Sequence, residues 1–397
     1  MQPDELNFIL SEAGAAVLEA LAAEPLTPDT HLATAARLRT QLEPAQANAA
    51  LELTLLRRQA AAKFSRSGRM YFTRDGLEQA TAEPLAAHRA HRYAQAGVSL
   101  VADMGCGIGG DALALAATGS TVIAIDREWA HAVMTAANAA VYGLTDTVSP
   151  IQADLVELPP LRVDAFFFDP ARRTIGGPSQ APGRRLKSVH DYRPPLSLID
   201  TWRPLVPRGA VKVSPAIDYT ELPAGVEAEF VSFHGEVREG VLWYGELRTA
   251  TRRATLLPKG DTLTDREPES AEAGEPRQYL YEPDGAVIRA HLVGQLAHQI
   301  DASLLDPTIA YLTADEVVLT PFARSYIIED HFPFQLKRLR HYLRERDVGT
   351  VTIKKRGSPL DPDVLRQALR LRGDSQRTIF LTRVMGRATV LIGHPTG

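Results

Sequence analysis

The spacing of apolar residues changes along the chain and divides it into segments of different structure. Up to about residue 67, apolar residues recur at helical spacing, and prolines at positions 25, 28 and 44 divide the segment into short helices. From residue 98 to about residue 257, short apolar runs alternate with helical patterns, which predicts a parallel sheet covered on both faces. A second alternation of strand and helix patterns begins at residue 279.

These patterns predict an α/β protein of two or three domains. We expect a helical domain over residues 1–69, a doubly wound α/β domain over residues 70–257 and a further α/β domain over residues 278–397. Residues 258–277 are charged and nearly free of large apolar side chains, so we expect a linker there. With 397 residues, of which 45% are hydrophobic, the chain can bury a large core.

The composition disfavours several classes of protein. No run of about 18 apolar residues and no signal peptide is present, so we expect a cytoplasmic protein without a membrane span. A single cysteine, Cys106, excludes an intrachain disulfide and a thiolate zinc cluster, and we predict no metal site. The net charge of −4 does not indicate a nucleic-acid binder, although a local basic patch can bind nucleic acid on a chain of negative net charge.

Residues 98–110 are the most informative stretch, because an apolar run is followed at once by glycines. The run up to Asp103 has the length and β-branched content of a buried strand, and a helical pattern follows the glycines. Glycines at such a junction allow a tight turn and let a ligand approach the main chain. Gly105, Gly107 and Gly110 also fit the spacing of a dinucleotide site, so the glycines alone leave NAD open.

The acid before the glycines favours a different cofactor. Asp103-x-Gly-x-Gly-x-Gly is the pattern of class I S-adenosylmethionine methyltransferases, and a pyrophosphate would be repelled by this carboxylate. Asp126 ends the next strand, where an acid suits a ribose diol, and Asp154 ends the third, where it can accept a hydrogen bond from adenine. Such acids also close loops and cap helices, but three in register favour a nucleotide site.

The fourth strand, residues 163–168, delivers Asp169 and Pro170 beside the switch point of the predicted sheet. We predict that the Asp169 carboxylate and the Pro170 carbonyl hold the amine that is methylated. Arg172 and Arg173 follow, and they can pair with a phosphate, stack on a base or bond to neighbouring loops. Because Cys106 lies in the glycine loop, it is badly placed for the thiolate addition that pyrimidine C5 methylation requires.

Basic residues gather near the C-terminus. A helix predicted over residues 333–346, together with the residues that follow a strand predicted over 350–353, carries eight Lys or Arg between positions 337 and 356, against two acids. Such a density favours contact with a phosphate backbone, although a solvated face is an equal alternative. The predicted substrate-binding residues of this region are Lys337, Arg340, Arg344, Lys354, Lys355 and Arg356.

The glycine loop and the strand-end acids resemble the methyltransferase domain of the trimethylguanosine synthase family. Four segments carry the resemblance: residues 103–111, 122–126, 138–143 and 153–154. Thr81 and Glu83 look like that family's Thr-Pro-Glu segment, which implies that they lie over the cofactor and the entering base. Thr81 is also predicted to cap the next helix. The family's fourth-strand motif is Ser-Pro-Pro-Trp, whereas Asp169-Pro-Ala-Arg172 lacks the stacking Trp, so only the cofactor role carries over.

Over nearly its full length the chain is similar to a bacterial group of class I methyltransferases with a C-terminal THUMP-like domain. This similarity implies a Rossmann-like fold with a mostly parallel, seven-stranded sheet. THUMP domains bind RNA in enzymes that modify tRNA and rRNA, which implies an RNA partner. The residues expected to contact S-adenosylmethionine are Thr81, Glu83, Asp103, Gly105, Cys106, Gly107, Gly109, Asp126, Arg127 and Asp154.

The leading hypothesis is therefore an S-adenosylmethionine-dependent methyltransferase that modifies a base nitrogen in tRNA or rRNA. One alternative is a methyltransferase that acts on a small molecule or a protein. Another is a catalytically silent RNA-binding protein that retains the cofactor as a ligand.

Overall fold

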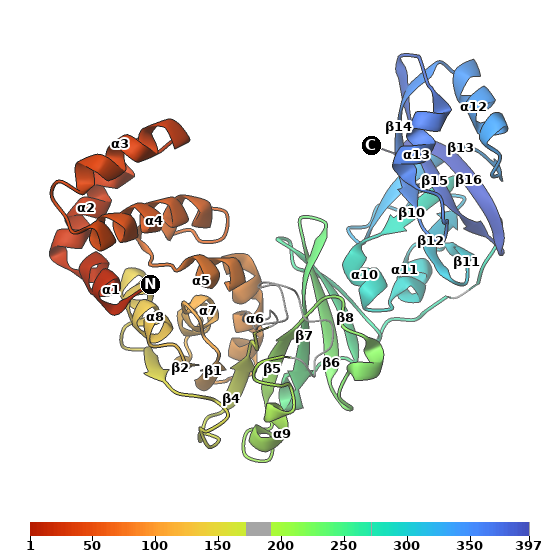
Figure 1. The fold of residues 1–397 in the computed structure, drawn as a ribbon. Helices are drawn as coiled ribbons and strands as arrows, with labels where there is room; N and C mark the ends of the chain where they lie inside the picture. Colours follow the sequence, from red (N-terminus) through yellow and green to blue (C-terminus); the bar gives the residue numbers. More distant parts are fainter. Residues whose placement is uncertain (172–191, 271, 397) are drawn as a thin grey trace. The chain divides into compact units, whose positions relative to one another are not determined.

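The computed structural model describes residues 1–171, 192–270 and 272–396 (Figure 1). The chain divides into two compact units. The first unit contains Met1–Val226 and Gly240–Thr249, and the second contains Glu227–Glu239 and Ala250–Gly397. In the described ranges, no helix has both the length and the apolar character needed to cross a membrane.

Helices form the N-terminal part of the first unit, as predicted. Pro28 and Pro44 each occupy the first helical position, where a missing N–H removes no hydrogen bond. Leu53 and Leu56 are buried on the longest of these helices and join the core of the unit. In chain order the helices are α1 (Pro3–Leu10), α2 (Glu12–Ala22), α3 (Pro28–Leu38), α4 (Pro44–Ala60), α5 (Arg74–Gln79) and α6 (Glu83–Gln95).

A parallel sheet follows these helices. Its elements are β1 (Leu100–Met104), α7 (Gly110–Ala117), β2 (Thr121–Asp126), α8 (Trp129–Tyr142), β3 (Val148–Gln152), β4 (Ala165–Phe168), α9 (Leu198–Trp202) and β5 (Gly209–Val213). Strand β1 pairs in parallel with both β2 and β4, so the strand order reverses at β1. The carboxyl ends of β1 and β4 therefore meet where Met104 lies opposite Phe168.

Nine strands belong to this sheet rather than the seven predicted. Hydrogen bonds order them β3-β2-β1-β4-β5-β7-β6-β8-β9. The additional strands arise because β8 (Arg252–Leu257) pairs in parallel with β6 (Glu227–Phe233), and β9 (Asp261–Thr264) pairs antiparallel with β8. Strand β7 (Glu236–Tyr244) runs antiparallel to β5. The prediction of a linker is wrong for residues 261–264, whose backbone forms β9.

The second unit also contains a seven-stranded sheet, ordered β11-β12-β10-β13-β16-β15-β14. The predicted helix over residues 333–346 is shorter, because Pro333 still pairs with Thr389 at the end of a strand. The elements are β10 (Tyr279–Pro283), α10 (Gly285–Arg289), α11 (Val293–Gln299), β11 (Ser303–Asp306), β12 (Ile309–Ala314), β13 (Ala323–Pro333), α12 (Leu336–Glu345), β14 (Val348–Lys355), α13 (Pro362–Leu369), β15 (Ser375–Val384) and β16 (Arg387–Pro395).

Asn138 connects three segments of the first unit. Its side chain is fully buried on α8. The Oδ1 atom accepts a hydrogen bond from the Tyr71 N–H at 2.8 Å, and Nδ2 donates to the carbonyls of Tyr71 at 3.1 Å and Ile108 at 2.9 Å. This one amide therefore ties the segment before α5 to the glycine loop.

We predict that Asn138→Ala lowers the free energy of unfolding by about 3 kcal/mol, because it leaves buried backbone groups without partners. Urea unfolding followed by circular dichroism measures this loss. Asn48→Ala is the matched control, since Asn48 is exposed and bonds only to Arg39 among the described residues; its effect is expected to stay within about 0.5 kcal/mol. Equal losses in the two variants would contradict the prediction.

Candidate active site

The glycine loop packs tightly at its two ends and leaves its centre open. Gly105 has a φ of +86°, and a Cβ atom there would lie 3.0 Å from the backbone oxygen of Asp169. Gly109 has a φ of +88°, and its Cβ would lie 2.9 Å from Cγ2 of Thr135. A Cβ at Gly107, where φ is +55°, would meet nothing within 4 Å. The main chain at Gly107 is therefore open to a ligand.

Asp103 is buried near the end of β1. Its exposed fraction is 0%, and neither carboxylate oxygen has a hydrogen-bond partner among the described residues. Burial, together with the charges of Asp111, Asp169 and Asp126, raises the pKa of Asp103 well above its usual value. A buried carboxylate without hydrogen-bond partners is stabilised most by a nearby positive charge. The methionine ammonium of S-adenosylmethionine carries such a charge.

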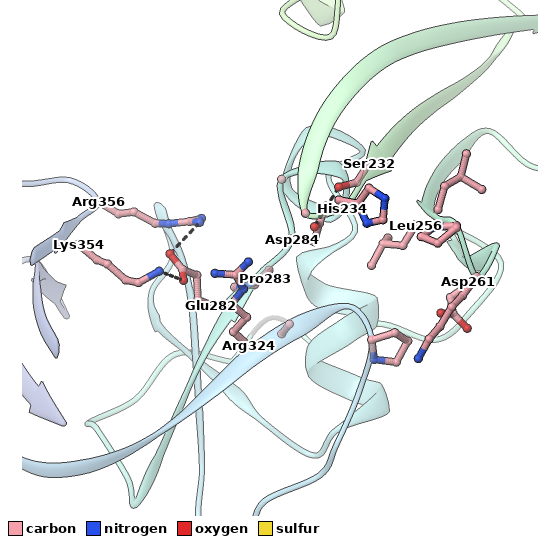
Figure 2. Close-up of a pocket in the computed structure, with 17 residues that line it drawn as sticks. Ser232, His234, Leu256, Asp261, Glu282, Pro283, Asp284, Arg324, Lys354 and Arg356 are labelled. Carbon is pink, nitrogen blue, oxygen red and sulfur yellow. Dashed lines mark hydrogen bonds and ion pairs between the residues drawn. The ribbon is translucent and has the colours of Figure 1, made fainter. Parts of the chain in front are cut away.

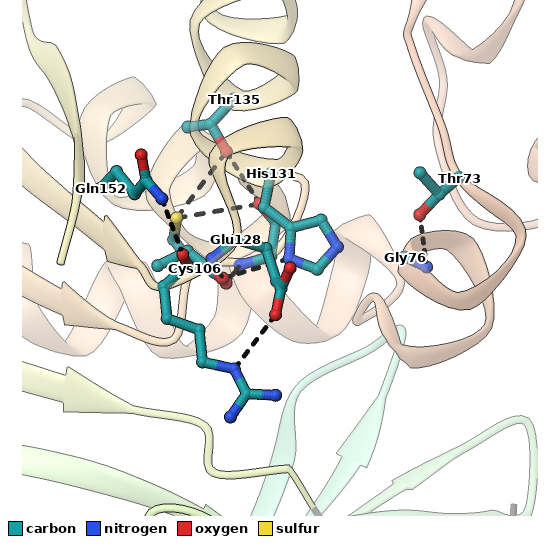
Figure 3. A network of polar contacts seen from close by, with 10 residues as sticks. Thr73, Gly76, Cys106, Glu128, His131, Thr135 and Gln152 are labelled. Atoms are coloured by element: carbon teal, nitrogen blue, oxygen red, sulfur yellow. Dashed lines mark hydrogen bonds and ion pairs between the residues drawn. The ribbon is translucent and has the colours of Figure 1, made fainter. Parts of the chain in front are cut away.

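Asp126 already has partners at the end of β2, and two of the residues it contacts, Glu128 and His131, are labelled in Figure 3. One carboxylate oxygen accepts the N–H of Gly107 at 2.9 Å, and the other accepts the N–H of Glu128 at 2.9 Å. His131 Nδ1 lies 3.2 Å from the second oxygen. Burial acts to lower the pKa of His131, but the hydrogen bond and charge of Asp126 outweigh it and raise the pKa. Asp126 therefore holds the glycine loop, and its role toward a ribose remains a prediction.

Three further residues predicted to contact the cofactor, Cys106, Asp154 and Arg127, differ in how exposed they are. Cys106 is buried, and burial with the charges of Asp103 and Asp126 raises the pKa of its thiol well above the usual value. Its thiol therefore stays protonated and is a poor nucleophile. Asp154 is exposed and accepts the Val156 N–H at 2.9 Å, which leaves it accessible to a ligand. Arg127 is exposed and pairs with Glu128 at 3.2 Å.

Thr81 does not cap the next helix, so that prediction is wrong. Helix α6 begins at Glu83, and its N-cap, Ala82, makes no side-chain cap bond. The Thr81 side chain instead accepts a hydrogen bond from Lys212 Nζ at 2.7 Å. The Glu83 carboxylate accepts hydrogen bonds from the backbone N–H of Ser65 at 2.6 Å and its hydroxyl at 3.0 Å. The Glu83 carboxylate is therefore hydrogen-bonded to Ser65, which lies between α4 and α5.

Asp169 follows β4 and lies beside the glycine loop, as predicted from its position in the sequence. Its backbone N–H donates to the Met104 carbonyl at 3.2 Å, and the following Pro170 is buried. The unpredicted feature is Lys212 on β5, whose Nζ lies 2.5 Å from Asp169 Oδ2. In the sequence, Lys212 is noticeable because it is a charged residue among the apolar residues and glycine of Gly209–Val213. In the structure this strand is buried at every position.

The predicted basic patch does not form one surface of free cations. Arg172 and Arg173 lie outside the described residues. On α12, Arg340 donates to the Ala368 carbonyl and Arg344 to the Arg370 carbonyl at 3.4 Å, while Lys337 is exposed. These two arginines therefore bind the C-terminal end of α13.

Two residues at the end of β14 line a cavity in the second unit. Lys354 pairs with Glu282, and Arg356 Nη2 lies 3.9 Å from the same carboxylate (Figure 2). Lys355, between them, donates to the Leu360 carbonyl at 3.2 Å. The cavity has a volume of about 530 Å³. Arg324 and Lys259, which were not predicted, also line it, and neither has an ion-pair partner in the described part of the chain.

Among the described residues, no group of three or more His, Cys, Asp or Glu side chains is arranged to hold a metal ion.

Substitutions at two loop glycines are expected to separate folding from ligand binding. We predict that Gly105→Ala lowers the free energy of unfolding by at least about 2 kcal/mol, because φ is positive and the Asp169 oxygen is too close. Gly107→Ala costs about 1 kcal/mol of stability but weakens S-adenosylmethionine binding about tenfold. Denaturant unfolding and titration calorimetry measure the two effects. Unchanged affinity in Gly107→Ala would rule out ligand approach at this point.

The raised pKa of Asp103 predicts a pH dependence of stability. Because the folded carboxyl holds its proton to higher pH than the unfolded one, its contribution is complete below about pH 4 and is lost as pH rises. Asp103→Asn removes this loss, so its stability relative to wild type increases from pH 4 upward, by at most about 1.4 kcal/mol per pH unit. Urea unfolding at pH 4 to 8 measures the difference; parallel curves would contradict the assignment.

Three family models match parts of the chain. The model described as RNA cap guanine-N2 methyltransferase matches residues 98–187, which include the glycine loop and Asp169. A THUMP domain-like model matches residues 323–395, and a domain of unknown function matches residues 2–60.

Whole-chain comparisons agree with these matches. A crystal structure from Porphyromonas gingivalis W83, described as a methyltransferase, covers 100% of this chain and 99% of its own with a TM-score of 0.75; at 21% identity it shows a shared fold. An uncharacterized S-adenosylmethionine-dependent methyltransferase of Mycobacterium tuberculosis, found in strains CDC 1551 and H37Rv, is 35% identical over 352 residues, covering 84% of this chain and 92% of the relative. The protein therefore belongs to the S-adenosylmethionine-dependent methyltransferases and carries a THUMP-like domain.

Proposed function

We propose that the protein transfers the methyl group of S-adenosylmethionine to a nitrogen of an RNA base. The observation that carries this proposal is the position of Asp169. It follows β4 at the point where the strand order reverses, and its backbone oxygen lies against Gly105 of the cofactor loop. A hydrogen-bond acceptor at this point lies close to the methyl group of a cofactor held by the loop.

When bound, S-adenosylmethionine supplies a methyl group that is electrophilic because it is attached to a positively charged sulfur. The work left to the chain is mainly alignment. Asp169 Oδ2 is occupied by Lys212, whereas Oδ1 has no hydrogen-bond partner among the described residues. This oxygen can accept a hydrogen bond from an exocyclic or ring N–H and so direct the nitrogen lone pair at the methyl carbon.

The thiol chemistry of the chain favours nitrogen over carbon as the methyl acceptor. Methylation of pyrimidine C5 requires a thiolate that adds to the ring, and Cys106 is the only cysteine. Its thiol is buried, and its pKa is raised well above the usual value. The amine of a base needs no such covalent activation.

Two observations support RNA as the substrate class. The family models that match are an RNA cap guanine-N2 methyltransferase and a THUMP-like domain. In the second unit, Lys259, Arg324, Lys354 and Arg356 line one cavity together with Asp261, Glu282 and Asp284. Lys354 and Arg356 share Glu282, so Lys259 and Arg324 are the cations of this lining without an ion-pair partner among the described residues. Cations held around a cavity attract phosphate oxygens, and guanidinium groups bind them in a bidentate manner. The RNA, the nucleotide and the assignment of site residues are all part of this proposal.

We predict that Asp169→Ala lowers the rate of methyl transfer by at least about 100-fold but leaves the affinity for S-adenosylmethionine within about threefold of wild type. Mass spectrometry of nucleosides from total RNA, in cells with and without the gene, identifies the modified base. The variant is then assayed with labelled cofactor on that RNA. If no nucleoside changes when the gene is removed, RNA is excluded as substrate, and label in a small molecule or protein would redirect the assignment.

A further inference from the structure

Lys212 is the most unusual polar residue of the first unit. It lies on β5, where every residue from Gly209 to Val213 is buried, and its own exposed fraction is 4%. Burying an ammonium group is costly unless it is paired and hydrogen-bonded. Replacing a buried ion pair by apolar residues is often neutral or even stabilising. The core of the sheet therefore gives no reason for a lysine at this position.

The contacts of Lys212 point to the reacting centre. The Nζ atom lies 2.5 Å from Asp169 Oδ2 and 2.7 Å from Thr81 Oγ1. It thus joins β5 to the residue after β4 and to the segment between α5 and α6. An ammonium has three rotatable donors, and these two contacts use two of them.

Thr81 is itself held in place. The carbonyl of Ala80 accepts a hydrogen bond from Lys63 Nζ at 2.9 Å, and the backbone N–H of Glu83 donates to the Lys63 carbonyl at 2.9 Å. The hydroxyl that meets Lys212 therefore comes from a fixed segment rather than from a free loop.

We propose that Lys212 is a positioning residue, whose ammonium bridges Thr81 and Asp169 and so holds the Asp169 carboxylate with Oδ1 directed at the substrate amine. This inference rests on the proposed function, because it assigns Asp169 as the acceptor of that amine. It adds a fixed orientation to Asp169, whose side chain would otherwise rotate about two bonds at the end of a strand. A small displacement of such an acceptor costs rate rather than affinity.

The test uses Lys212→Met, Thr81→Val and the double variant in the full-length chain. We expect Lys212→Met to lower kcat about 100-fold and Thr81→Val to lower it several-fold, with the KM for RNA nearly unchanged. If both act through the Asp169 orientation, the double variant is no slower than Lys212→Met alone. Two independent losses that multiply, or a kcat of Lys212→Met within about threefold of wild type, would overturn the inference.

A matched control separates positioning from stability. Arg92 is another cation of the first unit, and it donates to the Leu247 carbonyl at 2.7 Å and to Thr249 Oγ1 at 3.1 Å. Arg92→Met removes these contacts away from Asp169, so we expect a lower melting temperature with kcat unchanged. If Lys212→Met does not fold, Thr81→Val alone decides, since it keeps the ion pair and removes only the hydroxyl.

A structural measurement separates failure of this inference from failure of the proposed function. Crystals of Lys212→Met with S-adenosylhomocysteine are expected to show the Asp169 carboxylate rotated or in several orientations. An unmoved carboxylate would overturn the role of Lys212 even if the protein methylates RNA. Conversely, wild-type protein without activity on any RNA would overturn the proposed function, while a rotated carboxylate would still show that Lys212 orients Asp169.

Discussion

The candidate active site depends on the position of β1 between two parallel neighbours. Because β2 and β4 both run in the direction of β1, the three strands end at one edge of the sheet. Asp103, Asp126 and Asp169 therefore come close enough for their charges to act on one another. The same pairing brings the Asp169 carbonyl against the glycine loop, which explains why position 105 must be glycine.

Gathering acids at one edge of a sheet is unfavourable unless each carboxylate finds a partner, and three of the acids here have one. Asp111 pairs with Arg89, Asp126 accepts two backbone N–H groups, and Asp169 pairs with Lys212. Among the described residues, Asp103 alone of these acids has no hydrogen-bond partner. Burial leaves it with a raised pKa and a need for positive charge. We therefore expect Asp103 to be the acid of this edge that partners the ammonium group of a sulfonium cofactor.

The basic residues near the C-terminus show that tertiary contacts decide which charged side chains are available to a ligand. Eight Lys or Arg lie close in sequence, but Arg340 and Arg344 bind carbonyls at the end of α13. Lys354 and Arg356 instead share Glu282 at the cavity, where Arg324 joins them from β13. Arginine side chains are long donors that satisfy helix ends as readily as phosphates, so their number in the sequence does not predict how many face a ligand.

The local features of this protein can be predicted from its amino-acid sequence alone. The helices that begin at proline, the strand before the glycines and the acids that end each strand follow from spacing and backbone preferences. Which side chains contact one another depends on strand pairing between distant parts of the chain. Lys212 lies 131 residues from Thr81 and 43 from Asp169, and its role depends on the pairing of β5 with β4. Pairing between distant strands is a property of the whole sheet, whereas residue spacing reports only on neighbours within a few turns.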